Sequence, residues 1–147
     1  MKENLSFKDR LSIVLYRNGS PVYMYQTEDL VTNLGKSRVA GLINGVFTTS
    51  FTYVAIGTGT VAPSESDTSL GNEVARVAAT CSTVTTTNSG DTARLVGTFS
   101  FDATLAITES GVFNASSGGD MLCRQTFPVI NVLPGDGLQI TWDIQVQ

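Results

Sequence analysis

Short runs of alternating apolar and polar residues, separated by turn-forming residues, cover most of this chain. The clearest run spans residues 138–146, where every second residue is apolar: Leu138, Ile140, Trp142, Ile144 and Val146. Strict alternation predicts a strand with one buried face and one polar face. Trp142 has the largest side chain on the buried face, so we expect it to anchor the core.

Turn signals between such runs predict two hairpins. The first covers residues 11–27, because Asn18-Gly19 separates a run at 11–16 from a run at 22–26. In the second, a long strand over 74–87 turns at 88–91 and returns over 92–101. One face of the outgoing strand is expected to carry Val77, Ala79, Cys81 and Val84. One face of the returning strand is expected to carry Leu95, Gly97, Phe99 and Phe101.

The remaining runs predict further strands and a single helix. The strands cover 51–56, 105–109, 111–114 and 121–127, the last one ended by Pro128. The helix covers 32–44, with Thr32 or Asn33 as its N-cap and Asn44-Gly45 as its stop. Its apolar stripe would consist of Leu34, Val39, Leu42 and Ile43.

This pattern favours one mainly β domain over residues 1–147. Eight or so strands with turn signals every ~8–12 residues predict an antiparallel β-sandwich or a jelly-roll-like barrel with one short helix. The polar segment 1–10 has two interpretations. It is either an N-terminal arm that orders on a neighbouring subunit, or a frayed terminus.

The amino-acid composition favours proteins over nucleic acids as binding partners. Only 15% of the residues are charged, and about one residue in five is Ser or Thr. Hydroxyl groups thus replace charges on the surface, which suits a protein packed against other proteins. The net charge of −4 argues against nucleic acid as a partner. No apolar run is long enough to cross a bilayer, and the polar start Met1-Lys2-Glu3-Asn4 predicts no signal peptide.

The two cysteines, Cys81 and Cys123, are expected to be partly buried thiols of a protein made in a reducing cytosol. A disulfide between them would require adjacent strands, and the sequence leaves that open.

The chain offers little for catalysis. It contains no histidine, which excludes Ser-His and Cys-His nucleophiles and histidine-ligated metals. Chemistry by carboxylates, Lys or Tyr remains open, but Asp102 and Glu109 are not placed together by any pattern. Gly57-Thr58-Gly59 lacks the lysine and the helix of a phosphate loop, so it predicts a turn. We therefore predict no catalytic, cofactor-binding or metal-binding residue.

Loop carboxylates do not change that picture. Five acidic residues are candidate calcium ligands: Glu65, Asp67, Glu73, Asp120 and Asp136. Their spacing does not match an EF-hand loop, so we expect their carboxylates to be solvated. Glu109 is expected to form an ion pair with Arg124 or Arg76.

Several blocks of this sequence resemble small structural proteins of tailed-bacteriophage virions. They lie at 30–35, 51–60, 67–73, 107–114, 118–124 and 132–142, so the resemblance covers roughly residues 28–146. It implies a non-enzymatic protein that is made in the host bacterial cytoplasm and resides in the virion. The main expectation is a capsid decoration or cement protein. The alternative is a neck, tail, baseplate or fibre-associated protein.

The resemblance also implies partners. These are other virion proteins, either the major capsid protein or neck and tail proteins, together with further copies of the chain in a homo-oligomer, for which we expect a trimer. No membrane and no cofactor is implied.

Aromatic residues are the candidate contact residues. Tyr16, Tyr23, Tyr25 and Phe47 are the candidates for a protein interface, because Tyr is favoured at interfaces. The competing interpretation is that they pack in the core of the N-terminal hairpin. A less favoured function is a carbohydrate-binding module for host recognition. With Trp142 in the core, only Tyr and Phe would remain for stacking on sugars.

Overall fold

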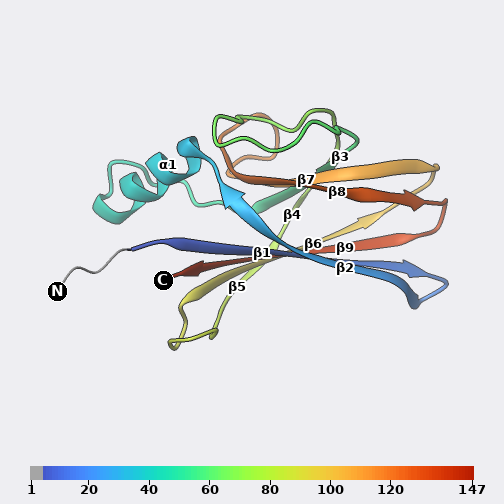
Figure 1. The fold of residues 1–147 in the computed structure, drawn as a ribbon, viewed down its shortest axis with the longest axis horizontal. Coiled ribbons are helices and arrows are strands. Elements are labelled where there is room, and N and C mark those ends of the chain that lie inside the picture. The colour runs from blue at the N-terminus through green and yellow to red at the C-terminus, as the bar shows by residue number, and fades with distance from the viewer. Residues whose placement is uncertain (1–4) are drawn as a thin grey trace.

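The computed structural model describes residues 5–147, except for the side chains of Asp29 and Leu30, and shows two antiparallel sheets packed face to face (Figure 1). The elements are β1 (Phe7–Arg17), β2 (Ser20–Val31), α1 (Asn33–Asn44), β3 (Tyr53–Gly57), β4 (Glu73–Ala78), β5 (Thr80–Val84), β6 (Thr92–Ser100), β7 (Leu105–Phe113), β8 (Met121–Val132) and β9 (Gly137–Val146).

The five-stranded sheet has the order β2-β1-β9-β6-β5, and the four-stranded sheet has the order β4-β3-β7-β8. The last residues of β2, Leu30 and Val31, leave the first sheet and pair with β8 of the second. The prediction of a mainly β antiparallel sandwich with one short helix is confirmed. The sandwich is open, so the alternative of a closed jelly-roll-like barrel is wrong.

The first predicted hairpin forms, and the second forms only between residues 80–84 and 92–96. Asn18 and Gly19 adopt positive φ angles of 53° and 78°, which is the backbone of the tight turn that joins β1 to β2. The predicted arm over 1–10 is wrong for residues 7–10. They belong to β1, because that strand is paired on both sides, with β2 and with β9. Met1 to Asn4 of the predicted arm lie outside the described residues.

The helix begins and ends where the sequence predicts. The side chain of Thr32 accepts a hydrogen bond from Gly35 N, and Gly45 ends the helix at φ 77°. The predicted apolar stripe is only partly correct, since Ile43 is 73% exposed. The helix is attached by its first turn, where Thr32 Oγ1 donates to Met121 O at 2.8 Å. None of the described helices is both long and apolar enough to cross a lipid bilayer.

The predicted long strand over 74–87 is two strands in different sheets. β4 pairs with β3, whereas β5 pairs with β6. The chain changes sheets at Ala79, whose N–H donates to Thr52 O at 2.8 Å. Cys81 lies opposite the buried Leu95, so it is on the predicted inward side, but it is exposed because β5 is the outermost strand of its sheet.

Two other predicted strand limits are also wrong. The runs 105–109 and 111–114 form the single strand β7. Strand β8 continues past Pro128 to Val132. Pro128 is tolerated because the pairing with β7 shifts there, from Ile107–Ile130 to Glu109–Thr126, and leaves the proline outside the ladder.

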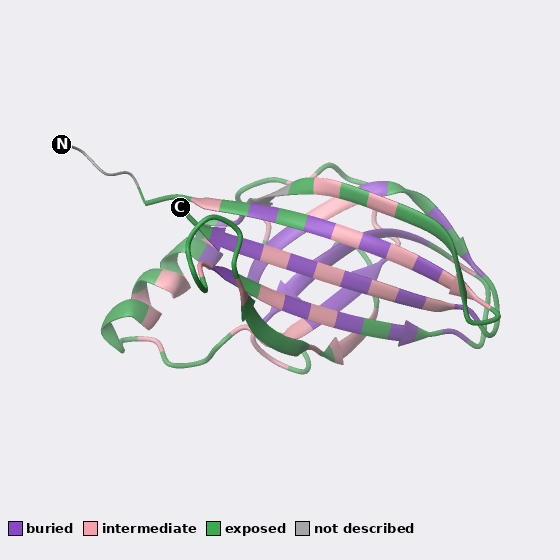
Figure 2. Cartoon of the chain, turned by 90° about the horizontal axis from the view of Figure 1, so that it is seen from below, coloured by how far each residue is buried: buried purple, intermediate pink, exposed green. Residues whose placement is uncertain are grey.

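The core lies between the sheets. Alternate residues of the three central strands of the five-stranded sheet, β1, β9 and β6, are buried, as the stripes along these strands in Figure 2 show. Trp142 is fully buried, as predicted. The inward residues predicted for the returning strand are buried as well: Leu95, Gly97 and Phe99 of β6, and Phe101 just after it. Gly97 lies opposite the other sheet, where an added Cβ would meet Val54 Cβ at 2.9 Å.

Candidate functional site

The four predicted contact aromatics do not form one patch. Tyr25 packs against the core, with its ring centroid 6.4 Å from that of Phe127. Tyr23 lies on the same, inward-facing side of β2 but near the hairpin turn, and it is 39% exposed. Tyr16 pairs with Gly137 and points to the opposite face of the sheet.

Phe47 lies at the far end of the molecule from the β1–β2 turn. Its N–H donates to Gly41 O of α1, which Figure 1 shows at the same end of the molecule as the C-terminus. The guanidinium of Arg38 stacks on its ring, 4.8 Å from the centroid. The structure thus assigns Tyr25 to core packing and leaves Tyr16, Tyr23 and Phe47 on three separate parts of the surface.

A broader candidate for contact is the outer face of the five-stranded sheet. The strand register places two rows of uncharged residues across β6, β9, β1 and β2, and none of these eight residues is buried. One row contains Thr98, Gln139, Val14 and Met24, and the other contains Val96, Thr141, Ser12 and Gln26. We call these eight residues the neutral band. Met24 is 72% exposed.

A row of alternating charges borders the neutral band. Arg94, Asp143, Arg10 and Glu28 lie side by side on neighbouring strands. Arg94 holds Asp143 in a two-pronged ion pair, with both N–O distances at 2.8 Å. The hydrogen bond from Gln26 Nε2 to Ser12 Oγ, at 3.1 Å, fixes two side chains of the band itself. The face is therefore ordered, uncharged at its centre and charged along one side.

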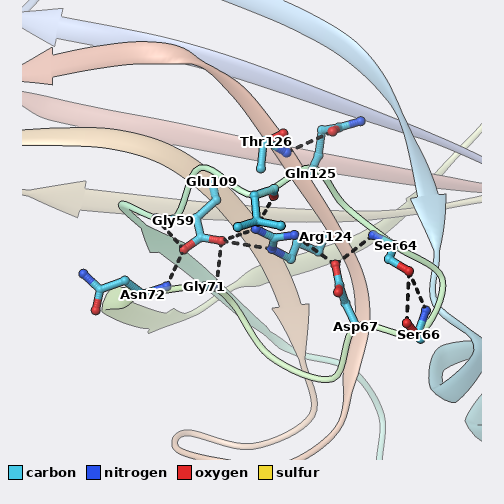
Figure 3. Close-up of polar contacts among 11 residues, drawn as sticks. Gly59, Ser64, Ser66, Asp67, Gly71, Asn72, Glu109, Arg124, Gln125 and Thr126 are labelled. Atoms are coloured by element: carbon cyan, nitrogen blue, oxygen red, sulfur yellow. Dashed lines mark hydrogen bonds and ion pairs between the residues drawn. The ribbon is translucent and has the colours of Figure 1, made fainter.

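A buried carboxylate lies on the opposite sheet (Figure 3). Glu109 of β7 is 0% exposed. Its oxygens accept hydrogen bonds from Gly59 N, Gly71 N, Asn72 N and Arg124 Nε, at 2.8–2.9 Å. The ion pair with Arg124 confirms one of the two predicted partners.

Arg124 extends this network into the long loop between β3 and β4. Its Nη1 contacts Asp67 Oδ2 at 2.9 Å, and its Nη2 donates to Val61 O at 2.8 Å. The Glu109–Arg124 pair thus fastens residues 58–72 to the four-stranded sheet. The sequence predicted Arg124 or Arg76 as the ion-pair partner of Glu109, but not the three backbone donors, because they come from a loop with no regular pattern.

The geometry makes Glu109 a structural group. Burial by itself raises the pKa of the Glu109 carboxyl, but the three backbone N–H groups and Arg124 outweigh burial and hold the pKa below its usual range. A general base works best with a pKa near the operating pH and with access to substrate. Glu109 meets neither condition, because its pKa is lowered and its oxygens are already occupied by protein donors.

Most of the loop carboxylates expected to be solvated are ion-paired. Asp67 contacts Arg124, and the remaining pairs are Glu73 with Arg76, Asp120 with Arg38 and Asp136 with Arg17. The prediction of solvated loop acids is wrong for these four. Arg76 is three residues from Glu73 on the same strand, whereas the fold brings the other three acids to arginines distant in sequence. Within residues 5–147, no three His, Cys, Asp or Glu side chains are grouped to hold a metal ion.

Among the described side chains, the Asp9 carboxylate is buried without a hydrogen-bond partner. Both oxygens of Asp9 lack a hydrogen bond, and the side chain is 1% exposed. Burial raises the pKa of Asp9 to about 7. Its register neighbours are Asp29 and Ile144. No feature of the sequence pattern set Asp9 apart from the exposed charges around it.

An apolar pocket of about 290 Å³ opens between the sheets near α1. Its lining contains one polar residue, Ser50, among Phe7, Val31, Val39, Phe51, Ala93, Leu95, Leu122, Ile144 and Val146. Sugar sites combine aromatic platforms with several polar groups that fix hydroxyls. This pocket lacks such groups, so it offers no support for the carbohydrate-binding alternative.

Comparison of the chain with protein-family models, with curated proteins and with solved structures found no significant match to any of the three.

Proposed function

We propose that this protein is a non-enzymatic structural protein of a tailed-bacteriophage virion, acting as a capsid decoration or cement protein. The observation that carries the proposal is the neutral band. Eight uncharged, unburied residues form a flat, ordered surface on a rigid sheet. Interfaces differ from other surfaces by depletion of charge at their centre, with polar groups around the rim.

The mechanism is adhesion by repeated contacts. The neutral band crosses four strands spaced ~4.8 Å apart, so it is roughly 14 Å wide, and its two rows lie ~7 Å apart along the strands. Its area is therefore well below the ~800 Å² per partner of a standard interface. A single contact of this size is weak. Many copies bound to a regular shell gain affinity through multivalency, so each contact can remain weak.

The proposed setting is the virion, after synthesis in the bacterial cytoplasm. The proposed partners are the major capsid protein and further copies of this chain, with a trimer as the expected oligomer. The clamp formed by Glu109 and Arg124 supports this role, because it holds the longest loop of the four-stranded sheet in one conformation. A rigid loop loses less entropy on binding.

Copy number in the particle tests the proposal. Quantitative mass spectrometry of purified phage particles measures the ratio of this chain to the major capsid protein. Hundreds of copies per particle support decoration. A few to a few tens would reject it and favour the neck, tail, baseplate or fibre. Absence from the particle would reject a virion role altogether.

A surface variant tests the neutral band. Thr98→Glu places a charge in the band at an exposed position. We expect it to bind shells that lack the protein at least tenfold more weakly than the wild type, with unchanged thermal stability. The matched control is Ser117→Glu in an exposed turn outside the band. Equal binding by both variants would contradict the assigned surface.

A further inference from the structure

Strand β5 is an open border of the five-stranded sheet. It pairs with β6 on one side, and no described strand pairs with it on the other. The N–H and C=O groups of its alternate residues, those that do not bond to β6, therefore face outward along one edge. Such an edge is a template for another strand unless the protein protects it.

The side chains of β5 offer almost no protection. Four of its five residues are exposed, and none of Thr80, Cys81, Ser82, Thr83 and Val84 is charged or proline. Natural edges are usually guarded by lysine, proline, bulges or a covering loop. Its short length is the one protective feature that β5 has.

The border of the other sheet shows what a guarded edge looks like in this same protein. Strand β4 carries Glu73 and Arg76, which form an ion pair at 2.6 Å. Arg76 also donates to Ala115 O and Gly118 O, both at 2.8 Å, and so draws the 114–120 turn towards that border. The difference between the two borders points to β5 as the one that receives a strand.

We propose that β5 pairs with β5 of a second copy of this chain, antiparallel and across a two-fold axis at Ser82. A two-fold axis perpendicular to a sheet places one residue of the strand directly opposite the same residue of the second copy. Ser82 is the middle residue of β5, so only an axis at Ser82 lets all five residues of one strand pair with all five of the other. Thr80 then faces Val84, and Cys81 faces Thr83. Each pair combines small or β-branched uncharged residues, which suit facing positions on neighbouring strands.

The strand favours a copy of itself over a different partner because it is self-complementary. The chain carries a net charge of −4, yet the pairing places no charge opposite another charge. The contact is isologous and therefore joins two molecules. In a trimeric assembly it would connect one ring to the next. The inference concerns the purified chain and does not depend on the virion assignment.

Disulfide trapping tests the register. In a variant with Cys81→Ser and Ser82→Cys, the new thiol would face its own copy, with Cβ atoms ~4.5–5.5 Å apart, close enough for a disulfide after small adjustment. We expect mild oxidation to give a covalent dimer on non-reducing gels, which a reductant reverses. The matched control combines Cys81→Ser with Thr80→Cys on the same exposed edge. There the two thiols lie four residues apart, so we expect at least tenfold less dimer.

Sedimentation equilibrium gives an independent readout. Ser82→Lys would put two like charges opposite each other and abolish concentration-dependent dimerisation, whereas Ser117→Lys would leave it unchanged. Thermal melts confirm that each variant is folded. Equal cross-linking of both cysteine variants, no cross-linking of either, or a Ser82→Lys protein that dimerises like the wild type would each overturn the proposal. None of these results bears on copy number in the virion.

Discussion

Trp142 and Ser110 join the two sheets through a hydrogen bond inside the core. Trp142 Nε1 of β9 donates to Ser110 Oγ of β7 at 3.1 Å, and Ser110 Oγ in turn donates to Ala55 O of β3 at 2.8 Å. The indole, the hydroxyl and the carbonyl are all buried. A buried indole N–H without a partner would be costly, so the serine is what allows tryptophan at this position.

Removing the indole should be severely destabilising. We expect Trp142→Ala to lower the free energy of unfolding by about 3–5 kcal/mol, through lost burial and a large cavity. Ser110→Ala should cost about 1–3 kcal/mol, because it leaves the indole N–H unpaired. Urea denaturation measures both values. Thr141→Ala, on the outer face of the same strand, is the control and should change stability by less than ~0.5 kcal/mol. Equal small losses for all three would contradict the strand orientation.

Glu109→Gln tests the loop clamp. The substitution keeps the size of the side chain but removes its charge, which leaves Arg124 buried without its main counter-ion. We expect a loss of about 3–5 kcal/mol at pH 7. Because the pKa of Glu109 is lowered in the folded state, its stabilising effect is present above the ordinary pKa and is lost as the pH falls through the folded-state pKa. The difference between variant and wild type should therefore shrink in acid.

Limited proteolysis gives the clamp prediction a local readout. In the Glu109→Gln protein we expect faster cleavage within residues 58–72, the loop that Glu109 and Arg124 hold. Glu65→Gln, an exposed substitution in the same loop, is the control. Unchanged cleavage rates in Glu109→Gln would show that the loop is held by other contacts.

Asp9→Asn should change how stability depends on pH. The pKa of Asp9 is raised to about 7 in the folded protein, from an ordinary value of 3.8. The folded state thus binds a proton that the unfolded state has released between these values. Wild-type stability should consequently fall as the pH rises from about 4 to about 7, and then level off. Each pKa unit corresponds to about 1.4 kcal/mol, so the full loss is a few kcal/mol.

Urea melts at pH 4.5 and pH 8 check this prediction. The asparagine variant carries no titrating group at this position, so we expect it to be more stable than the wild type at pH 8 and to lose that advantage at pH 4.5. The control is Asp102→Asn, an exposed carboxylate between β6 and β7. An Asp9→Asn advantage that is the same at both pH values would contradict the assignment.

Gly97 lies at a close approach of the two sheets. A methyl group at this position would lie 2.9 Å from Val54 Cβ and 3.2 Å from Val77 Cγ2. Gly97→Ala should therefore cost about 1–3 kcal/mol, the usual range for overpacking. Gly137→Ala is a matched control in the neighbouring strand, where the nearest atom lies 3.8 Å away. A thermal melt that shows similar effects for both would refute the close packing.

The sequence by itself determined the local parts of this structure. The hairpin at Asn18-Gly19, the helix with its caps at Thr32 and Gly45, and the inward face of β9 with Trp142 were all predictable. Each depends on turn chemistry or on a periodicity that the chain carries within a few residues. The mainly β antiparallel sandwich followed from the number and spacing of such runs.

Only the tertiary structure decided the rest. An alternating run cannot reveal that its strand changes sheets at Ala79, because both halves have the same period. Nor can a local rule show that β8 passes Pro128 by shifting its pairing. The three backbone donors to Glu109 come from positions 37–50 residues earlier in the chain. The neutral band depends on strand order and register, which are set by packing between distant segments.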